Sequence, residues 1–598
     1  MKTAAAAVVF LITLGIAIPS SSGRERSAAV AMATTRSSGV LANAEKDYWE
    51  FLQKRSLVLR LRLGLPVEEL PDLSEARAHA DAVYGAELLQ KLRGLREIEL
   101  SHEESLSLAM LREEARDLLD SQRDYWLTFP VTPYASPERV VHQVFTSWRF
   151  RTPEDLDRYA SLLTRYAAFI RQMEEKLRAQ ARRGIRLPKA EISPVAETYR
   201  AAIAEPADSL FFVPPGRLEQ EADQDRGPFT KRVEGLISSR INPALESLAS
   251  YVSGDYATKA PSTVGLAQYP GGRAYYQRLV RFHTTLDVTP EEIHRLGLAE
   301  VDRLNGELGE VQAAVGFDGT LAEFRRHLRS DPRFVPATPD EIGERLLAAQ
   351  KRIETKIPLY FGKTPSAPAG IRRLSPNLES AMTYGFYQAP TASDPRGYYY
   401  YNGSSLADRS LLSAAALVYH ELIPGHHFQR SLQNENPDLP SFRREAAWTA
   451  YTEGWGEYAS SLAGEMGMYE DPYDRAGRLS MDAFLSARLV VDTGMNALGW
   501  SRARAIAYMK ENTLESDTQI ATETLRYSCD VPGQALAYKM GAAKIRDLRA
   551  RAERALGPSF DIRRFHDVVL GSGPMPMAVL ERHVDWFIES ERVRTASR

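Results

Sequence analysis

The 598-residue sequence has almost no cysteine and almost no net charge. Its single cysteine, Cys529, cannot form a disulfide within the chain, so an exported protein of this length must be stable without such cross-links. Lysine and arginine total 75 against 78 aspartate and glutamate, which gives neither the basic surface of a nucleic-acid-binding protein nor a polybasic membrane patch. Apolar residues make up 44%, which argues against long disordered tracts. The composition therefore predicts a folded, soluble protein with a large core.

The first residues form a separate signal. A lysine at position 2 is followed by an apolar run over residues 4–18 and then by small polar residues. This order is typical of a secretory signal peptide, and the run is short for a membrane span. We expect residues 1–33 to be that signal, cleaved after Ala33 or nearer Gly23, with an uncleaved anchor as the alternative. No cysteine lies near enough to carry a lipid, so the mature chain is expected in the periplasm or secreted, without a membrane span.

Helical patterns dominate the rest of the chain. Residues 42–120 are rich in Leu, Ala, Arg and Glu, with apolar residues at helical spacing. Residues 152–177 begin with a threonine suited to cap a helix and then place apolar residues at steps of three and four. The sequences TPEE from Thr289 and TPDE from Thr338 predict two further helix starts.

Strands are expected near residues 380–402, where aromatic runs flank a Pro, Asp and Gly segment. We expect residues 398–402 to form an edge strand on which a peptide substrate lies in extended form, so that Tyr400 and Asn402 contact the substrate. The alternative is ordinary core packing of the tyrosines.

The stretch ALVYHELIPGHHFQRSL nearly contains a familiar zinc motif. In H-E-x-x-H, two histidines four residues apart project from one helical face toward one metal ion, and the glutamate acts as general base. His420 and Glu421 open this pattern, but Pro424 stands where the second histidine is expected, and the next histidines come two and three residues later. Either these histidines form a metal site, or the proline ends a helix and they cap it or face solvent.

A later segment supplies the carboxylate that such a site needs. In glutamate-type zinc peptidases the third ligand is a carboxylate on a later helix, which leaves one position open for water. Glu453 lies 33 residues after His420, and Glu457 follows one helical turn later, where it could accept the free N–H of a ligating imidazole. Gly454 and Gly456 weaken the helix, so we expect another backbone or the metal-binding helix to approach closely there. The alternative is two solvated glutamates on a surface helix.

The pattern H-E-x-x-P-G-H-x-x-Q, which begins here at His420, is the hallmark of a bacterial family of unknown function, DUF885, and the chain resembles that family. The resemblance extends to TEGWGEYA, YYYYNGSS and RYSCDVPGQALAYKMG, covers most of the mature chain and is strongest from about Tyr269 onward. We therefore divide the chain into an N-terminal helical region, residues 40–265, and a catalytic region, residues 266–598. Such proteins look like relatives of the helical zinc peptidases that include the oligopeptidase and angiotensin-converting enzyme families. The resemblance implies a mainly α fold, with a large helical metallopeptidase-like body, a deep cleft and a small β-sheet near the active site.

The spacing of the histidines can be reconciled with one metal ion if the proline and glycine interrupt the helix. An uninterrupted helix would carry His426 about 9 Å along its axis from His420. With two additional residues in an interruption, His426 can take the place of the missing second histidine. The predicted site therefore comprises one zinc ion per chain with His420, His426 and Glu453 as ligands and Glu421 as general base. His427 is either an alternative ligand or a group that supports a ligand without binding the metal.

A segment near the end of the catalytic region could complete the site. A helix that begins after a Pro-Gly pair would place Gln534 and Tyr538 on one face, where they could meet the substrate. By resemblance to the helical peptidases, which use a tyrosine from a late segment, Tyr538 is expected to donate a hydrogen bond to the oxyanion, with Tyr527 as the second candidate. Arg526 could bind a substrate carboxylate with its two-pronged guanidinium. For each of these residues a structural role in the core is the alternative.

The predicted function is an exported zinc-dependent hydrolase, a metallopeptidase that cleaves short peptides. Two alternatives stay open: a metal-dependent hydrolase of small amide or ester (acyl) substrates, and a non-catalytic peptide-binding protein on the same fold. Glu421 beside His420 favours catalysis, because a binding protein needs no base there. No nucleic-acid partner is expected.

Overall fold

The computed structural model describes residues 21–218, 223–379, 385–391 and 394–596. Within these ranges the chain is mainly helical, as the sequence predicts, with one small sheet. The helices of the first half are α1 (Ser21–Arg55), α2 (Leu57–Arg62), α3 (Glu75–Leu92), α4 (His102–Arg123), α5 (Glu138–Thr146), α6 (Pro153–Arg182), α7 (Lys189–Ala201), α8 (Asp223–Leu236), α9 (Asn242–Tyr251) and α10 (Gly272–Thr284).

The second half continues in the same way, and short 3₁₀ and π segments connect several of its helices. These helices are α11 (Pro290–Ala314), α12 (Leu321–Ser330), α13 (Pro339–Glu354), α14 (Ile357–Tyr360), α15 (Pro376–Glu379), α16 (Ala414–Glu421), α17 (His426–Glu435), α18 (Ser441–Glu445), α19 (Thr449–Glu465), α20 (Pro472–Asn496), α21 (Arg502–Asn512), α22 (Asp517–Leu525), α23 (Ala537–Leu556), α24 (Ile562–Gly571) and α25 (Met577–Ala596).

The predicted helix starts are confirmed by their capping contacts. At the start of α6, Thr152 and Asp155 form a capping box, and Gly184, just past the end of the helix, has a positive φ of 76° that suits glycine. Thr289 caps α11 in the same way with Glu292. At α13 the hydroxyl of Thr338 accepts a hydrogen bond from a backbone N–H of the first turn.

The sheet has three strands, β1 (Ala369–Arg373), β2 (Gly385–Gln388) and β3 (Gly397–Tyr401), in the order β1-β3-β2. β1 runs parallel to β3, and β2 runs antiparallel to it. The sequence located β2 and β3 but missed β1, and residues 380–384 of the predicted segment lie outside the described ranges. The expectation that the segment 398–402 forms an edge strand is wrong, because β3 pairs with a neighbour on each side. β2 is an edge strand.

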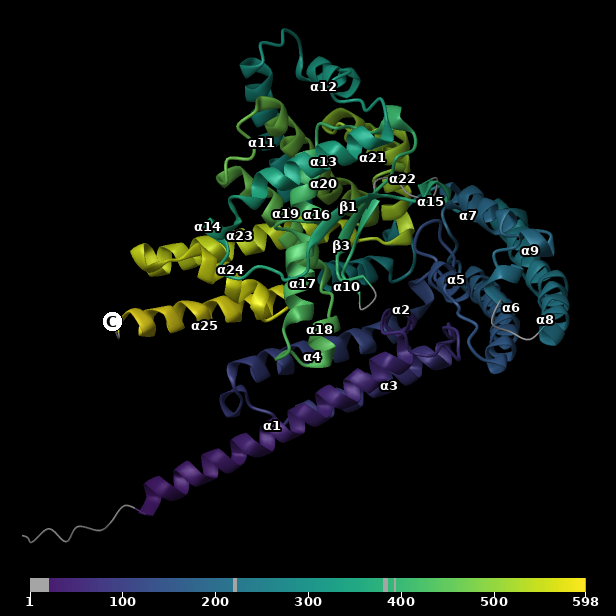
Figure 1. The fold of residues 1–598 in the computed structure, drawn as a ribbon, viewed down its shortest axis with the longest axis horizontal. Helices are drawn as coiled ribbons and strands as arrows, with labels where there is room; N and C mark the ends of the chain where they lie inside the picture. The colour runs from purple at the N-terminus through teal and green to yellow at the C-terminus, as the bar shows by residue number, and fades with distance from the viewer. Residues whose placement is uncertain (1–20, 219–222, 380–384, 392–393, 597–598) are drawn as a thin grey trace, which may run out of the picture.

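Separate hydrophobic cores organise the helices around the sheet (Figure 1). One core joins α1, α3 and α4 to α16, α19 and α23–α25. A second core lies within the lobe formed by α2 and α5–α9, which Figure 1 shows to one side of the molecule. The first helices of the chain therefore pack on the C-terminal half, while the proposed division at residues 265 and 266 stays a prediction.

Most of the predicted N-terminal signal lies outside the residues that the structure describes. Residues 1–20, which include the apolar run, fall outside the described ranges, and α1 begins at Ser21. Within those ranges, none of the helices combines the length and the apolar character that crossing a bilayer requires.

Candidate metal centre

An interruption between α16 and α17 brings two histidines together. α16 ends at Glu421 and α17 begins at His426, with a cis peptide bond before Pro424. A Cβ atom on Gly425 would lie 1.8 Å from the carbonyl oxygen of His420, so only glycine fits there. The two imidazole rings end with centroids 4.7 Å apart and planes at 86°. The predicted interruption is confirmed.

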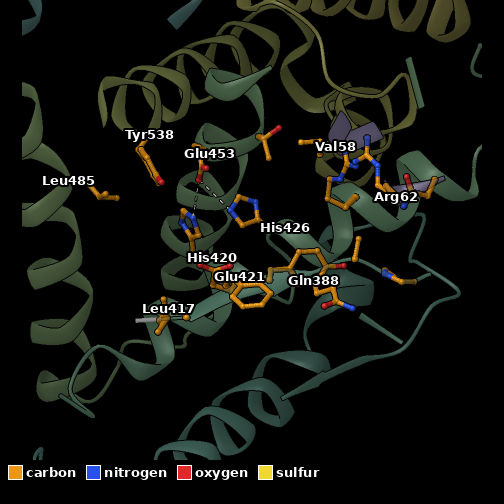
Figure 2. Close-up of a pocket in the computed structure, with 18 of the residues that line it drawn as sticks. Val58, Arg62, Gln388, Leu417, His420, Glu421, His426, Glu453, Leu485 and Tyr538 are labelled. Atoms are coloured by element: carbon orange, nitrogen blue, oxygen red, sulfur yellow. Dashed lines mark ion pairs between the residues drawn. The ribbon is translucent and has the colours of Figure 1, made fainter. Parts of the chain in front are cut away.

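Glu453 of α19 meets both rings (Figure 2). Its Oε2 lies 3.6 Å from Nε2 of His420 and 3.3 Å from Nε2 of His426, and the three ligand atoms all lie within 4.8 Å of one another. A tetrahedral zinc ion with bonds of about 2.0–2.1 Å separates its ligand atoms by roughly 3.4 Å. The donor atoms therefore have the chemistry and the spacing of a two-histidine, one-carboxylate zinc site.

Within the described ranges, the Glu453 carboxylate forms ion pairs only with the two imidazoles of the triad, and with no arginine or lysine. Burial alone raises the pKa of Glu453, but hydrogen bonds and charge from the two imidazoles outweigh burial and hold that pKa well below its ordinary value. For His426, burial lowers the pKa, and the hydrogen bond and charge of Glu453 outweigh it and raise the pKa. A carboxylate in this setting needs positive charge, which either protonated imidazoles or a metal ion can supply.

Gly454 and Gly456 of α19 have the predicted role. A Cβ atom on Gly456 would lie 2.9 Å from two ring atoms of His420. A Cβ atom on Gly454 would lie 2.5 Å from the backbone of Gly541 in α23. Side chains at these positions would push α19 away from α16, which carries His420, and from α23, so the close approach inferred from the sequence is confirmed.

Glu421 and Tyr538 flank the triad. Both line the same cavity as His420, His426 and Glu453, and Figure 2 shows Tyr538 on one side of Glu453 and Glu421 next to His420. Burial raises the pKa of Glu421, against the lowering effect of the two imidazoles. The ring of Tyr538 lies against that of His420, with centroids 6.0 Å apart.

The cavity is large and open at the triad. It encloses about 1250 Å³, enough for a small peptide. The Glu453 side chain keeps 20% of its surface exposed toward this space. All four residues of β2 line the cavity, as do Leu485 and Phe484 of α20 and Val58 of α2.

The other three residues predicted from the segment 526–538 are Arg526, Gln534 and Tyr527, and of these Arg526 lines the cavity. Arg526 donates to the side chain of Gln534 at 2.6 Å and lies 3.5 Å from Glu523. Gln534 and Tyr527 are not among the cavity-lining residues. Tyr527 is fully buried, and its hydroxyl has no hydrogen-bond partner in the described part of the chain. Tyr538, and not Tyr527, is therefore the tyrosine beside the triad.

Two residues predicted to support the ligands have other partners. The ring of His427 points to the sheet, where its nitrogens contact the hydroxyl of Tyr387 at 3.1 Å and the carbonyl of Ala367 at 2.9 Å. His426 thus lies beside Glu453 in the triad and His427 does not. Glu457 is fully buried and binds Arg478 at 2.5 Å.

The expectation that Glu457 accepts a hydrogen bond from a ligating imidazole is not met. In the described ranges, Nδ1 of both His420 and His426 and Oε2 of Glu457 have no hydrogen-bond partner. A carboxylate one turn after Glu453 is close in sequence, but the guanidinium of Arg478 competes for it more strongly than a neutral ring does.

The two residues predicted to bind substrate from the sheet do not reach the cavity. Tyr400 lies on the central strand and stacks on Phe386 with ring centroids 5.4 Å apart. Asn402 is buried, donates to the carbonyl of Glu379 and accepts from Ser404. Both are absent from the cavity lining. Asn402 is packed inside the protein, as the alternative expects, whereas Tyr400 is only half-buried. The central strand β3 offers a peptide no free backbone edge.

Several charged cavity residues were missed by sequence reasoning. Arg430, Arg444, Arg488 and Glu523 all line the cavity. For Arg430 a signal existed, since it lies one helical turn after His426 and must share its face of α17.

The sequence matches the family model described as bacterial protein of unknown function (DUF885) over residues 58–584. "The crystal structure of the putative lipoprotein from Colwellia psychrerythraea" is similar, with a TM-score of 0.85 and 26% identity over 93% of this chain and 100% of that chain. "The structure of a putative lipoprotein of unknown function from Shewanella oneidensis" has a TM-score of 0.71 at 16% identity, over 91% of this chain and 99% of that one, and supports the fold alone. No curated protein matches the sequence. On the strength of the family match, this chain belongs to the DUF885 family of bacterial proteins.

Proposed function

We propose that this protein is a zinc-dependent hydrolase that cleaves short peptides. One observation carries the proposal: the three predicted ligands converge from separate helices at a cavity that also receives Glu421. The similarity to helical zinc peptidases, inferred from sequence motifs, is part of the proposal.

In the proposed reaction, His420, His426 and Glu453 hold one divalent zinc ion. When bound, the ion supplies Lewis-acid chemistry, which acidifies water and polarises an acyl carbonyl. Glu421 accepts a proton from the attacking water and returns it to the leaving amine, so that one water is consumed as the C–N bond breaks. The raised pKa of Glu421 suits a group that must take and then give a proton. The hydroxyl of Tyr538 donates a hydrogen bond to the developing oxyanion.

The sheet supports a peptide as the substrate. β2 is an edge strand, and Gly385–Gln388 line the cavity beside the triad. An extended peptide can add to such an edge through backbone hydrogen bonds. An ester or an isolated amide would gain nothing from this edge, so its position favours a peptide over a small acyl substrate.

The test combines metal analysis with a base variant. The purified protein is expected to contain one zinc ion per chain and to cleave members of a peptide library. Glu421→Gln is expected to keep the zinc and to lower kcat by about 10²- to 10⁴-fold. Glu511→Gln, on the exposed face of α21, is the matched control and is expected to behave as wild type.

The same experiment separates the alternatives. Zinc without cleavage of any peptide, ester or amide would identify a binding protein. Cleavage of esters or small amides but not of peptides would identify the non-peptide hydrolase. Absence of a divalent metal from protein prepared without chelators, and from protein dialysed against zinc, would remove the basis of the proposal. Cobalt or manganese at full occupancy would change the metal but keep the mechanism.

We also propose an extracellular or cell-envelope location. The apolar run at residues 4–18 is the sequence support, and the two similar solved structures bear lipoprotein descriptions. Cell fractionation of the native host tests this: activity and antigen confined to the cytosol would contradict it.

A further inference from the structure

The charges along the cavity differ between its two ends. At the end beyond Tyr538, Arg488 pairs with Glu523 at 3.0 Å, and Arg526 lies 3.5 Å from the same carboxylate. Glu515 also lines this end, and its negative charge helps to raise the pKa of Arg488. Two arginines thus face two glutamates, and this end is neutral overall.

The opposite end, beyond His426, carries an excess of positive charge. Arg62, Arg430 and Arg444 line it together with one acid, Glu445, which forms an ion pair with Arg62. Figure 2 shows Arg62 on the far side of His426 from Tyr538. Among the described residues, Arg430 and Arg444 therefore form no ion pair, and the single charge of Glu445, which also acts on Arg430, cannot balance the three arginines at this end.

Arg430 is the better placed of the two. It follows His426 by one turn of α17, which puts both on one face, about 6 Å apart along the helix axis. Its Nη1 donates to the side chain of Gln433 at 2.7 Å and to the carbonyl of Ala446 at 3.2 Å. Its Nε and Nη2 have no partner in the part of the chain that the structure describes. The guanidinium thus donates hydrogen bonds from Nη1, and its Nε and Nη2 are left to donate to a ligand.

The support behind Arg430 is rigid. Gln433 is fully buried and donates to the carbonyls of Arg443 and Ala446, which ties α17 to α18. Gln429 donates to Gln433 in turn, at 2.9 Å. A guanidinium fixed in this way loses little freedom when it binds a ligand, and its planar fork matches a carboxylate.

We propose that Arg430, with Arg444 beside it, binds a carboxylate of the substrate on the His426 side of the metal centre. This inference rests on the proposed hydrolase function and gives it a substrate class. An extended peptide advances about 3.3–3.6 Å per residue, so the axial offset of about 6 Å corresponds to one or two residues. The enzyme thus acts on peptides with a free carboxylate one or two residues beyond the cleaved bond. Where that carboxylate is the chain terminus, the enzyme removes short fragments from the C-terminal end.

The experiment compares three N-acylated tetrapeptides: the free acid, its C-terminal amide, and the amide with glutamate as its last residue. Wild type is expected to cleave the free acid with a kcat/KM at least about 10-fold above that of the plain amide, because a charge-assisted pair is lost in the amide. Arg430→Gln is expected to bring this ratio close to one, through a fall in kcat/KM for the free acid. Arg123→Gln, an exposed arginine of α4, is the control and should keep the wild-type ratio.

The third peptide identifies the source of the carboxylate. If it matches the free acid, the subsite reads an acidic side chain; if it matches the plain amide, the subsite reads the chain terminus. Arg430→Lys, which keeps the charge but loses the fork, is expected to give an intermediate ratio. If Arg430→Gln lowers the unfolding temperature more than the control Arg123→Gln does, Arg444→Gln is used in its place. This variant is expected to lower the ratio of acid to amide cleavage by a smaller factor.

Titration calorimetry of the free acid and of the plain amide binding to Glu421→Gln separates this inference from the proposed function. Preferential binding of the free acid that depends on Arg430 supports the subsite even if wild type cleaves no peptide, in which case the hydrolase proposal alone fails. Equal cleavage of acid and amide by wild type leaves the hydrolase standing and overturns the subsite. Equal binding of acid and amide, or binding of neither, also overturns it.

Discussion

Replacement of Gly456 by alanine tests whether the packing of α19 against α16 sets the metal geometry. The added Cβ would lie 2.9 Å from Cε1 and Nε2 of His420. Carbon contacts are most favourable at about 3.5–4.0 Å, so the ring must move by roughly 0.6 Å. His420 is 3% exposed, and the surrounding side chains leave it little room except toward the cavity. The displacement therefore falls on the nitrogen that is proposed to bind zinc.

The size of the effect follows from the tolerance of zinc coordination. Metal–ligand distances hold to within about 0.2 Å, and a displaced or poorly oriented ligand typically costs about 10- to 100-fold in affinity. We expect Gly456→Ala to bind zinc about 10- to 100-fold more weakly, in competition with a chromophoric chelator. Each tenfold loss removes about 1.4 kcal/mol of the stabilisation that zinc gives to the folded state. Without metal, the variant should unfold close to the wild-type temperature.

Two other glycines of the same helix serve as controls. Gly464 is exposed, and a Cβ there would meet Tyr469 at an ordinary 3.4 Å, so Gly464→Ala should keep zinc affinity and stabilise the helix by about 0.5–1 kcal/mol. Gly454→Ala should destabilise the protein with or without zinc, because its Cβ would meet the backbone of Gly541 at 2.5 Å. Wild-type zinc affinity in Gly456→Ala would refute the reasoning that this close contact positions the ligand.

Three further predictions follow from the site and the core. His426→Ala should lose zinc, whereas His427→Ala should keep it and lose about 1–3 kcal/mol of stability with its two hydrogen bonds, as metal analysis and urea denaturation can show. Tyr538→Phe should keep the fold and the metal and lower kcat by about 10²- to 10³-fold; an unchanged kcat would remove it from the reaction. Burial raises the pKa of Glu191 from 4.5 to about 8, so the folded chain binds this proton more tightly, and the free energy of unfolding should fall as pH rises from 4.5 to 8. Glu191→Gln should flatten that fall, as denaturation at several pH values can measure.

Local sequence patterns located the three capped helix starts that were predicted. Thr152, Thr289 and Thr338 cap helices where the sequence predicts, because an N-cap depends on residues only three or four positions apart. The strand β1 escaped notice, since AGIRR has no alternation, and its extended form depends on pairing with β3. The order of the strands could not be inferred either. β2 and β3 are both rich in aromatic residues, and only the pairing in the fold makes β3 central and β2 an edge strand.

The candidate site also contains residues that the sequence predicted and one whose partner it did not predict. His420, Glu421, His426 and Glu453 were recognisable from spacing and residue type, since a metal site restricts both. Glu457 was assigned to a histidine on spacing alone, but Arg478 of α20 takes it in the fold. The partner came from a helix that the spacing argument did not include.

By itself, the sequence determined that the chain is mainly helical, which glycines must face close neighbours, and which side chains could serve one metal ion. These features follow from short-range backbone preferences and from the chemistry of a few residue types. The tertiary structure alone decided that Arg478 pairs with Glu457, which strand is left at the edge of the sheet, and which arginines of the cavity remain without an ion pair. Those outcomes depend on competition between partners that are distant in sequence, and the winner is set by how the helices pack.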